Sequence, residues 1–388
     1  MELDPLPFSA SLDCYGKQAE ELLEAFRAGD SKAICCFKER HPRFLDSKIP
    51  WLPKRLPDSE VAGTALDSSD AQLAVARWYD FLDWPALKKY VESVASQNSP
   101  VHRFESAVEA VIAGDLKTLG ALLSKSPDLI QARSLRVTHF DPPVHRATLL
   151  HYVAANGVER YRQKTPPNAV DVAKVLLRAG AEVDALADMY GGQCTTLSLL
   201  VSSCHPAQAG VQSELVETLL DFGASVEGVG VGRWVSPLMT ALAFGYQSTA
   251  ETLVKRGARV DDLATAAGLG RLADARRLLP SADGESRHRA LALAAQLGHA
   301  NIVRLLLDAG ENPNRFNPDG VHSHSTPLHQ AALAGHREVV ELLVGRGARL
   351  DIKDTIYQST PLAWAMHGEK TEVEKLLRSK QTTKPETL

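Results

Sequence analysis

The chain has 388 residues, of which 44% are hydrophobic and 23% are charged, with 43 Lys and Arg against 47 Asp and Glu. This composition is typical of a folded globular protein and excludes disordered and fibrous classes, while the net charge of −4 gives no reason to expect nucleic acid or an anionic membrane as the main partner. Five cysteines without a Cys-x-x-Cys pair argue against a disulfide framework and against a zinc ribbon.

The first residues, MELDPLPFSA, are acidic where a secretory signal would be basic and then apolar. No stretch of the sequence resembles the run of ~20 apolar residues that spans a membrane. We therefore expect a cytoplasmic protein without a membrane partner.

Four helices are predicted before residue 103. Apolar residues at helical spacing indicate one helix over Ala19–Phe26 and a second over Ala33–Phe37, and the proline-rich stretch Arg43–Asp67 is predicted to be a loop. A third helix follows Asp70, and Asp83 caps a fourth that has a proline in its first turn. We expect these helices to cover the apolar end of the segment that follows.

From residue 103 onward the chain repeats a two-helix unit, which is clearest in TPLHQAALAGHREVVELLVGRGARLD. Thr326 and Pro327 suit the N-cap and first turn of a helix that ends at Gly335. Gly347 ends the second helix, in the left-handed conformation that glycine adopts at little cost. The unit should therefore be a helix-turn-helix that stacks on its neighbours.

This unit resembles the ankyrin repeat. The resemblance covers about residues 103–380 and implies an all-α solenoid of about eight helix-turn-helix repeats with hairpin loops. Residues 1–102 are then a helical N-terminal capping region, and residues 381–388 are a polar tail. The predicted repeat openings are Glu105, Thr148, Thr195, Ser236, Asp261, Arg289, Thr326 and Thr360.

The repeat spacing departs from the family's period of about 33 residues. Extra residues separate the helices of the second and third repeats, around VERYRQKTPPN and HPAQAGV, and a connection of 22 residues leads from Ser126 to Thr148. Only 25 residues separate Ser236 from Asp261, and 28 separate Asp261 from Arg289. We expect a kink or a loosened joint near Asp261.

Two further segments resemble a group of uncharacterised bacterial ankyrin-repeat proteins. They are the helical leader DAQLAVARWYDFLDWPALKKYVE and the first clear repeat, HRATLLHYVAANGVE. The resemblance implies a bacterial cytosolic protein. It brings no established activity and no catalytic residues.

Polar and aromatic residues concentrate in three loops of the front repeats, SLRVTHFDPPVHRA, ADMYGGQCT and GVGVGRWVS. Loops on a rigid repeat scaffold commonly bind partners, and Arg, Trp and Tyr supply much of the binding energy at interfaces. We therefore predict a protein or peptide partner, bound through the front loops and concave helices. The residues predicted to bind are His139, Asp141, Tyr190, Arg233 and Trp234. In the alternative interpretation, Tyr190 and Trp234 only pack the stack of loops.

A second function stays open: an enzyme or small-molecule-binding protein whose pocket is closed by the inserted loops of repeats 1 to 3. Arg160 or Arg162 would hold an anionic group of the ligand. A deep cavity would favour this function, and an open groove the binding module. The candidates for acid–base catalysis are His139, Asp141, His145 and Tyr161.

Metal, cofactor and nucleic-acid sites are not predicted. The histidines near Asp141 lack a diagnostic metal-ligand spacing, and the repeat-motif histidines His151 and His329 should hydrogen-bond their own turns. His322 and His324 should be solvated in a loop. The GVGVG segment lacks the Lys-Ser/Thr of a phosphate loop, and basic residues are interleaved with acidic ones.

Overall fold

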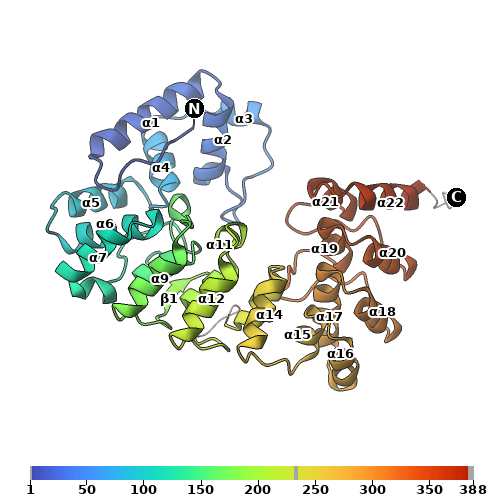
Figure 1. The fold of residues 1–388 in the computed structure, drawn as a ribbon. Helices are drawn as coiled ribbons and strands as arrows, with labels where there is room; N and C mark the ends of the chain where they lie inside the picture. Colours follow the sequence, from blue (N-terminus) through green and yellow to red (C-terminus); the bar gives the residue numbers. More distant parts are fainter. Residues whose placement is uncertain (1, 231–234, 383–388) are drawn as a thin grey trace. The chain divides into compact units, whose positions relative to one another are not determined.

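The computed structural model describes residues 2–230 and 235–382 (Figure 1). Two compact units divide the chain: the first extends to Ala224 and includes Gly230, and the second contains Ser225–Val229 and the residues from Val235 onward. Asp261 lies inside the second unit. The kink or loosened joint near it stays a prediction.

The first 100 residues are helical, as the apolar spacing predicts. Asp83 accepts a hydrogen bond from the backbone N–H of Ala86, which confirms the predicted cap, and Phe26 lies on the buried face of its helix. One short helix falls inside the segment that was predicted to be a loop. The helices are α1 (Leu12–Arg27), α2 (Ser31–Arg40), α3 (Asp58–Ala62), α4 (Ser68–Trp78) and α5 (Trp84–Val94), with a 3-10 turn at Pro42–Phe44.

The first unit continues with helix pairs that stack side by side (Figure 1). The extra residues predicted in the second and third repeats form a 3-10 turn at Arg160–Arg162 and the short helix α11 (Cys204–Gln208). The two strands pair antiparallel, with Ala187 opposite Cys194, and form a hairpin between repeats. The other elements are α6 (Pro100–Ala113), α7 (Leu116–Lys125), a 3-10 turn at Pro127–Gln131, α8 (Leu149–Val153), α9 (Ala169–Arg178), β1 (Ala187–Met189), β2 (Gly192–Cys194), α10 (Thr196–Leu200) and α12 (Gln212–Asp221).

The second unit is a regular succession of helix pairs, in which first helices contact first helices and second helices contact second helices (Figure 1). Its elements are α13 (Pro237–Ala243), α14 (Gln247–Lys255), α15 (Leu263–Gly268), α16 (Leu272–Leu278), a 3-10 turn at Leu279–Ser281, α17 (Gly284–Leu297), α18 (Ala300–Asp308), α19 (Pro327–Ala334), α20 (Arg337–Gly345), α21 (Pro361–His367) and α22 (Thr371–Thr382).

Most predicted repeat openings coincide with helix N-caps, but three do not. Asp261 lies one residue before the N-cap of α15, which is Asp262. Arg289 lies inside α17, because the carboxylate of Asp283 accepts the N–H of Ser286 and starts that helix earlier. Glu105 likewise lies inside α6, which starts after Ser99. A helix begins where a side chain can accept its unpaired N–H groups, and both regions offer such a residue upstream. The openings that are N-caps are Thr148, Thr195, Ser236, Thr326 and Thr360.

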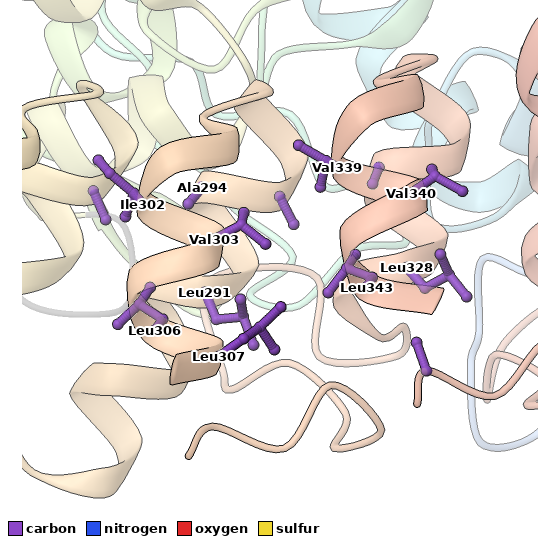
Figure 2. Close-up of a cluster of buried hydrophobic side chains, with 14 of the residues drawn as sticks. Leu291, Ala294, Ile302, Val303, Leu306, Leu307, Leu328, Val339, Val340 and Leu343 are labelled. Atoms are coloured by element: carbon purple, nitrogen blue, oxygen red, sulfur yellow. The ribbon is translucent and has the colours of Figure 1, made fainter. Parts of the chain in front are cut away.

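The core of the second unit follows from the helical spacing of its apolar residues. In α18, Ile302, Val303, Leu306 and Leu307 recur at spacings of one, three and four, which places them on one face. Figure 2 shows these side chains beside those of α17, α19 and α20. Gly335 and Gly347 adopt φ of 84° and 86°, as predicted for the glycines that end the two helices.

The helices of residues 2–230 and 235–382 are all too short or too polar to cross a membrane.

Candidate functional site

Three of the five predicted binding residues, His139, Asp141 and Tyr190, lie in the part of the chain that the structure describes. Tyr190 lies at the tip of the β1–β2 hairpin, is 59% exposed, and donates a hydrogen bond from its hydroxyl to Asn156 Oδ1 at 2.6 Å. Asp141 is exposed and precedes the cis peptide bond to Pro142. Arg233 and Trp234 lie outside the described residues. The grouping of these five residues into one surface stays a prediction.

The rings of His139 and His145 both pack against that of Phe140. The ring centroids lie 4.2 Å and 5.8 Å from that of Phe140, and the guanidinium of Arg160 lies 5.4 Å from the same ring. Burial, together with nearby Arg160, lowers the pKa of His139 to about 3, and burial also lowers the pKa of His145. A general base works best with a pKa near the operating pH, so this environment does not favour acid–base work by His139.

A cluster of buried charges lies where the inserted segments meet the N-terminal helices. We call Glu105, Arg136, Glu159 and Arg162 the ionic cluster; all four are at most 5% exposed. Arg162 Nη1 lies 2.6 Å from Glu105 Oε2 and 3.8 Å from Glu159 Oε2, and Arg136 Nε lies 3.4 Å from Glu159 Oε1. Because every member has an oppositely charged neighbour, the charges can be buried together.

Aromatic side chains enclose the ionic cluster. The guanidinium of Arg136 lies 4.2 Å from the ring centroid of Phe81 and 4.6 Å from that of Tyr90. Tyr90 donates a hydrogen bond to Glu105 at 2.9 Å, and the hydroxyl of Tyr161 accepts one from Arg136 at 2.9 Å. Burial raises the pKa of Tyr161, which therefore stays protonated at neutral pH. Tyr161, a predicted acid–base candidate, thus holds an arginine of its own chain.

The two arginines predicted to hold an anionic ligand are also engaged internally. Arg160 donates from its backbone N–H and from Nε to the buried carboxylate of Asp80, at 2.6 Å and 2.7 Å, and its Nη2 contacts the same group. Arg162 Nη2 also lies 3.0 Å from Glu109. Through Arg160 and Arg162, the segment from residue 158 to 168 therefore connects the turn after α4 to the repeats. These contacts give the insertion a structural role.

A groove with a volume of about 740 Å³ lies in the second unit. It is formed by the ends of the first helices of successive pairs and by the loops that precede α19 and α21. The lining contains aromatic, imidazole, amide and small side chains: Phe244, Gln296, His322, His324, Gln330, Leu333, Tyr357, Ser359, Ala363, Trp364 and His367.

Imidazole and aromatic rings pack against one another along this groove. The ring centroid of His324 lies 5.6 Å from that of Trp364, 6.2 Å from that of Tyr357 and 6.0 Å from that of His322. Nε2 of His322 lies 2.9 Å from the carbonyl oxygen of Ala243, and burial lowers the pKa of both histidines. His322 and His324 are half-buried in this packing, so the prediction of a solvated loop pair was wrong.

Asp354 fixes the loop that carries Tyr357. Its buried carboxylate accepts hydrogen bonds from the N–H groups of Ile356 at 2.9 Å, of Ser359 at 2.8 Å and of Tyr357, and from the indole Nε1 of Trp364 at 3.1 Å. The groove is therefore held in shape before any ligand binds. The sequence offered a signal for this arrangement, since an Asp with backbone partners two to five residues on is typical of a side-chain-stabilised turn.

The predicted roles of the repeat-motif histidines are confirmed. Nδ1 of His151 lies 2.8 Å from the hydroxyl of Thr148, and Nδ1 of His329 lies 2.8 Å from that of Thr326. Within residues 2–230 and 235–382, no group of three or more His, Cys, Asp or Glu side chains is placed to hold a metal ion.

Comparisons with known proteins agree with this architecture. Residues 263–354 and 291–386 match the family model of ankyrin repeats (3 copies). The chain is 28% identical over 215 residues to the Ankyrin repeat and KH domain-containing protein mask-1 of Caenorhabditis elegans, which covers 53% of this chain and 8% of that protein. It is 32% identical over 163 residues to the Ankyrin repeat and SAM domain-containing protein 6 of Danio rerio, which covers 38% of this chain and 21% of that protein.

Among solved structures, the human ASB11 ankyrin repeat domain aligns with 70% of this chain and 96% of its own, at 22% identity and a TM-score of 0.36. The chain spans less than a quarter of either curated relative named above. Both relatives are eukaryotic, so they lend no support to the predicted bacterial resemblance. Residues 263–386 of this chain are thus ankyrin repeats, a general module for binding other proteins.

Proposed function

We propose that the protein binds an extended segment of a partner protein in the groove of the second unit. The observation that carries this proposal is the convergence of aromatic and imidazole rings from separate repeats on one groove. Phe244 is 40% exposed and Tyr357 is 48% exposed, although both are large and apolar. Exposed aromatic side chains around a preformed concavity are typical of the centre of a protein interface.

The lining also indicates the chemistry of the bound segment. Among the described residues, the lining contains no Asp, Glu, Lys or Arg side chain, and the lowered pKa values of His322 and His324 keep both rings neutral near pH 7. Gln330 is buried and donates to Ser325 Oγ at 2.9 Å. Gln296 is half-buried and donates to the carbonyl oxygen of Ala243 at 2.8 Å, and its amide oxygen can accept a hydrogen bond from a peptide backbone. The groove therefore suits an uncharged segment with apolar or aromatic side chains.

Other predictions from the sequence stay proposals. The loops of His139, Asp141 and Tyr190 are proposed as a second contact surface. The ionic cluster supports a capping role for residues 1–102, and the succession of helix pairs supports about eight repeats. A cytoplasmic location and a bacterial source stay predictions.

The test is a comparison of single alanine variants in peptide binding. Peptides selected from a random library on the wild-type protein should bind at least about tenfold more weakly to Tyr357→Ala and to Phe244→Ala, because each change removes an exposed aromatic contact. Dissociation constants from fluorescence anisotropy check this. The backbone of residue 357 keeps its hydrogen bond to Asp354 in the variant, so the loop should stay in place.

Phe316→Ala is the matched control. Phe316 is also 40% exposed in the second unit, but it lies outside the groove lining. Its removal should leave peptide affinity unchanged. Equal losses in all three variants, or no loss in any, would show that the selected peptides bind elsewhere and would refute the proposed site.

A further inference from the structure

A second cavity lies in the first unit, far along the chain from the groove. It has a volume of about 650 Å³, which falls within the range of about 300 to 1,000 Å³ of small-molecule sites. Its walls come from α5, from the start of α6 and from the extended segment at residues 131–137. The apolar part of the lining consists of Phe81, Ala86, Pro100, Val101, Phe104, Ala132, Leu135 and Val137.

One wall of the cavity is held in position by the ionic cluster. Phe81 and Tyr90 line the cavity, and the guanidinium of Arg136 lies within 4.6 Å of both ring centroids. Glu105 is the one acidic residue of the lining in the part of the chain that the structure describes, and its carboxylate is already paired with Arg162 and Tyr90. The cavity is therefore preformed, and its carboxylate is not available to attract a cationic ligand.

Two cations of the lining have no such pairing. Lys89 is exposed, and no carboxylate of the described residues lies within ion-pair distance of it or of Arg133. Backbone carbonyls position the guanidinium of Arg133, with its Nη1 3.1 Å from the oxygen of Arg146 and 2.5 Å from that of Leu186. These contacts fix the side chain and leave its charge without a counter-ion.

A large apolar side chain beside the cavity is exposed to water. Leu135 is 69% exposed on the segment that borders the cavity, between the half-buried or buried side chains of its neighbours. A ligand that fills the cavity would cover part of this side chain, which is a favourable change because apolar surface leaves water.

We propose that this cavity binds a small amphipathic anion, with its apolar chain or ring against Phe104, Val101 and Leu135 and its anionic group toward Lys89 and Arg133. The apolar lining accounts for the apolar body, and the two unpaired cations account for the charge. The site lies wholly in the first unit, so it is independent of peptide binding in the groove.

Octanoate is the probe, and isothermal titration calorimetry with the full chain is the measurement. Octanoate should bind, and hexanoate should bind about fifteenfold more weakly, because each buried methylene contributes about fourfold in affinity. Octylamine, which has the same chain with a positive charge, should not bind measurably. Equal binding of octanoate and octylamine, or no binding of octanoate, would overturn the proposal.

Lysine variants test the position of the anionic group. Lys89→Gln should weaken octanoate binding by about fivefold, as expected for a surface ion pair, and should leave octanol binding unchanged. Lys88→Gln is the matched control, since Lys88 is the exposed neighbour on α5 and does not line the cavity. A similar loss in the Lys88 variant would assign the effect to general charge and contradict the site.

A cavity-filling variant gives an independent test. Ala86→Trp places an indole into the cavity from α5 and should abolish binding of both octanoate and octanol, with the circular dichroism spectrum unchanged. Retained binding in this folded variant would mean that the ligand lies elsewhere. If the variant does not fold, the comparison of Lys89→Gln with Lys88→Gln decides the question.

Discussion

Replacing Arg162 with Met is expected to lower the free energy of unfolding of the first unit by about 3 to 5 kcal/mol. The substitution keeps most of the side-chain volume but leaves Glu105 buried without the arginine that pairs with it, and leaves Glu159 with Arg136 alone. An unpaired buried carboxylate is costly because the protein interior cannot replace the water that solvates it. Urea denaturation followed by circular dichroism measures the change.

Hydrogen exchange read by mass spectrometry locates the effect. Peptides from α6 and α8 should lose protection in Arg162→Met, and peptides from α18 and α20 should keep it. Lys17→Met serves as the control, because it removes an exposed ion pair with Glu21 from the same unit and should change stability by less than about 1 kcal/mol. A similar small effect of both substitutions would contradict a stabilising role for the ionic cluster.

Replacing Asp354 with Ala is expected to destabilise the second unit by about 3 kcal/mol or more. Three backbone N–H groups and the indole of Trp364 would lose their acceptor, and each unsatisfied buried donor costs about 1 to 3 kcal/mol. The loop of Tyr357 would no longer be fixed, so peptide affinity should fall as well. Thermal unfolding and the anisotropy assay measure the two effects.

The effect of Asp354 should depend on pH. Burial disfavours the ionised carboxylate, but hydrogen bonds from Tyr357, Ser359 and Trp364 outweigh burial and hold its pKa below the ordinary value of 3.8. A lowered pKa in the folded state contributes stability above the pKa of the unfolded state, and this contribution is lost as the pH falls through the folded-state value.

The difference in melting temperature between wild type and Asp354→Ala should therefore be largest near neutral pH and should shrink below about pH 4. Asp351→Ala is the control, since Asp351 is exposed and pairs with Arg349 in the same loop region. It should shift the melting temperature little at any pH. A difference that stays constant from neutral to acidic pH would exclude the ionised form of Asp354 as the source of the stability.

The repeats could be predicted from the sequence because their signals are local. Capping residues, helix-ending glycines and apolar spacing each act within a few residues, so Thr326, Gly335 and Gly347 fell where the motif placed them. The start of α17 was misplaced at Arg289 because the motif was aligned on the alanines inside the helix. Asp283 precedes the first position of the repeat motif, so the motif does not include it. Its carboxylate caps the helix and starts it earlier than the motif predicts.

The candidate sites could be predicted only in part because their contacts join distant residues. Asp80 meets Arg160 across 80 positions, and His322 meets the carbonyl of Ala243 across 79. No spacing rule indicates such partners in a single sequence. The inserted VERYR segment is recognisable as unusual from the repeat spacing. Its charged residues, however, are equally compatible with binding a ligand and with forming ion pairs inside the protein.

The long-range ion pairs also constrain the order in which the chain can fold during synthesis. Asp80 and Glu105 leave the ribosome well before Arg160 and Arg162, which neutralise them. A nascent chain that ends in the first repeat must keep these carboxylates in water, since burying them alone would be unfavourable. The N-terminal helices should therefore complete their packing against the repeats only after the second repeat has been synthesised.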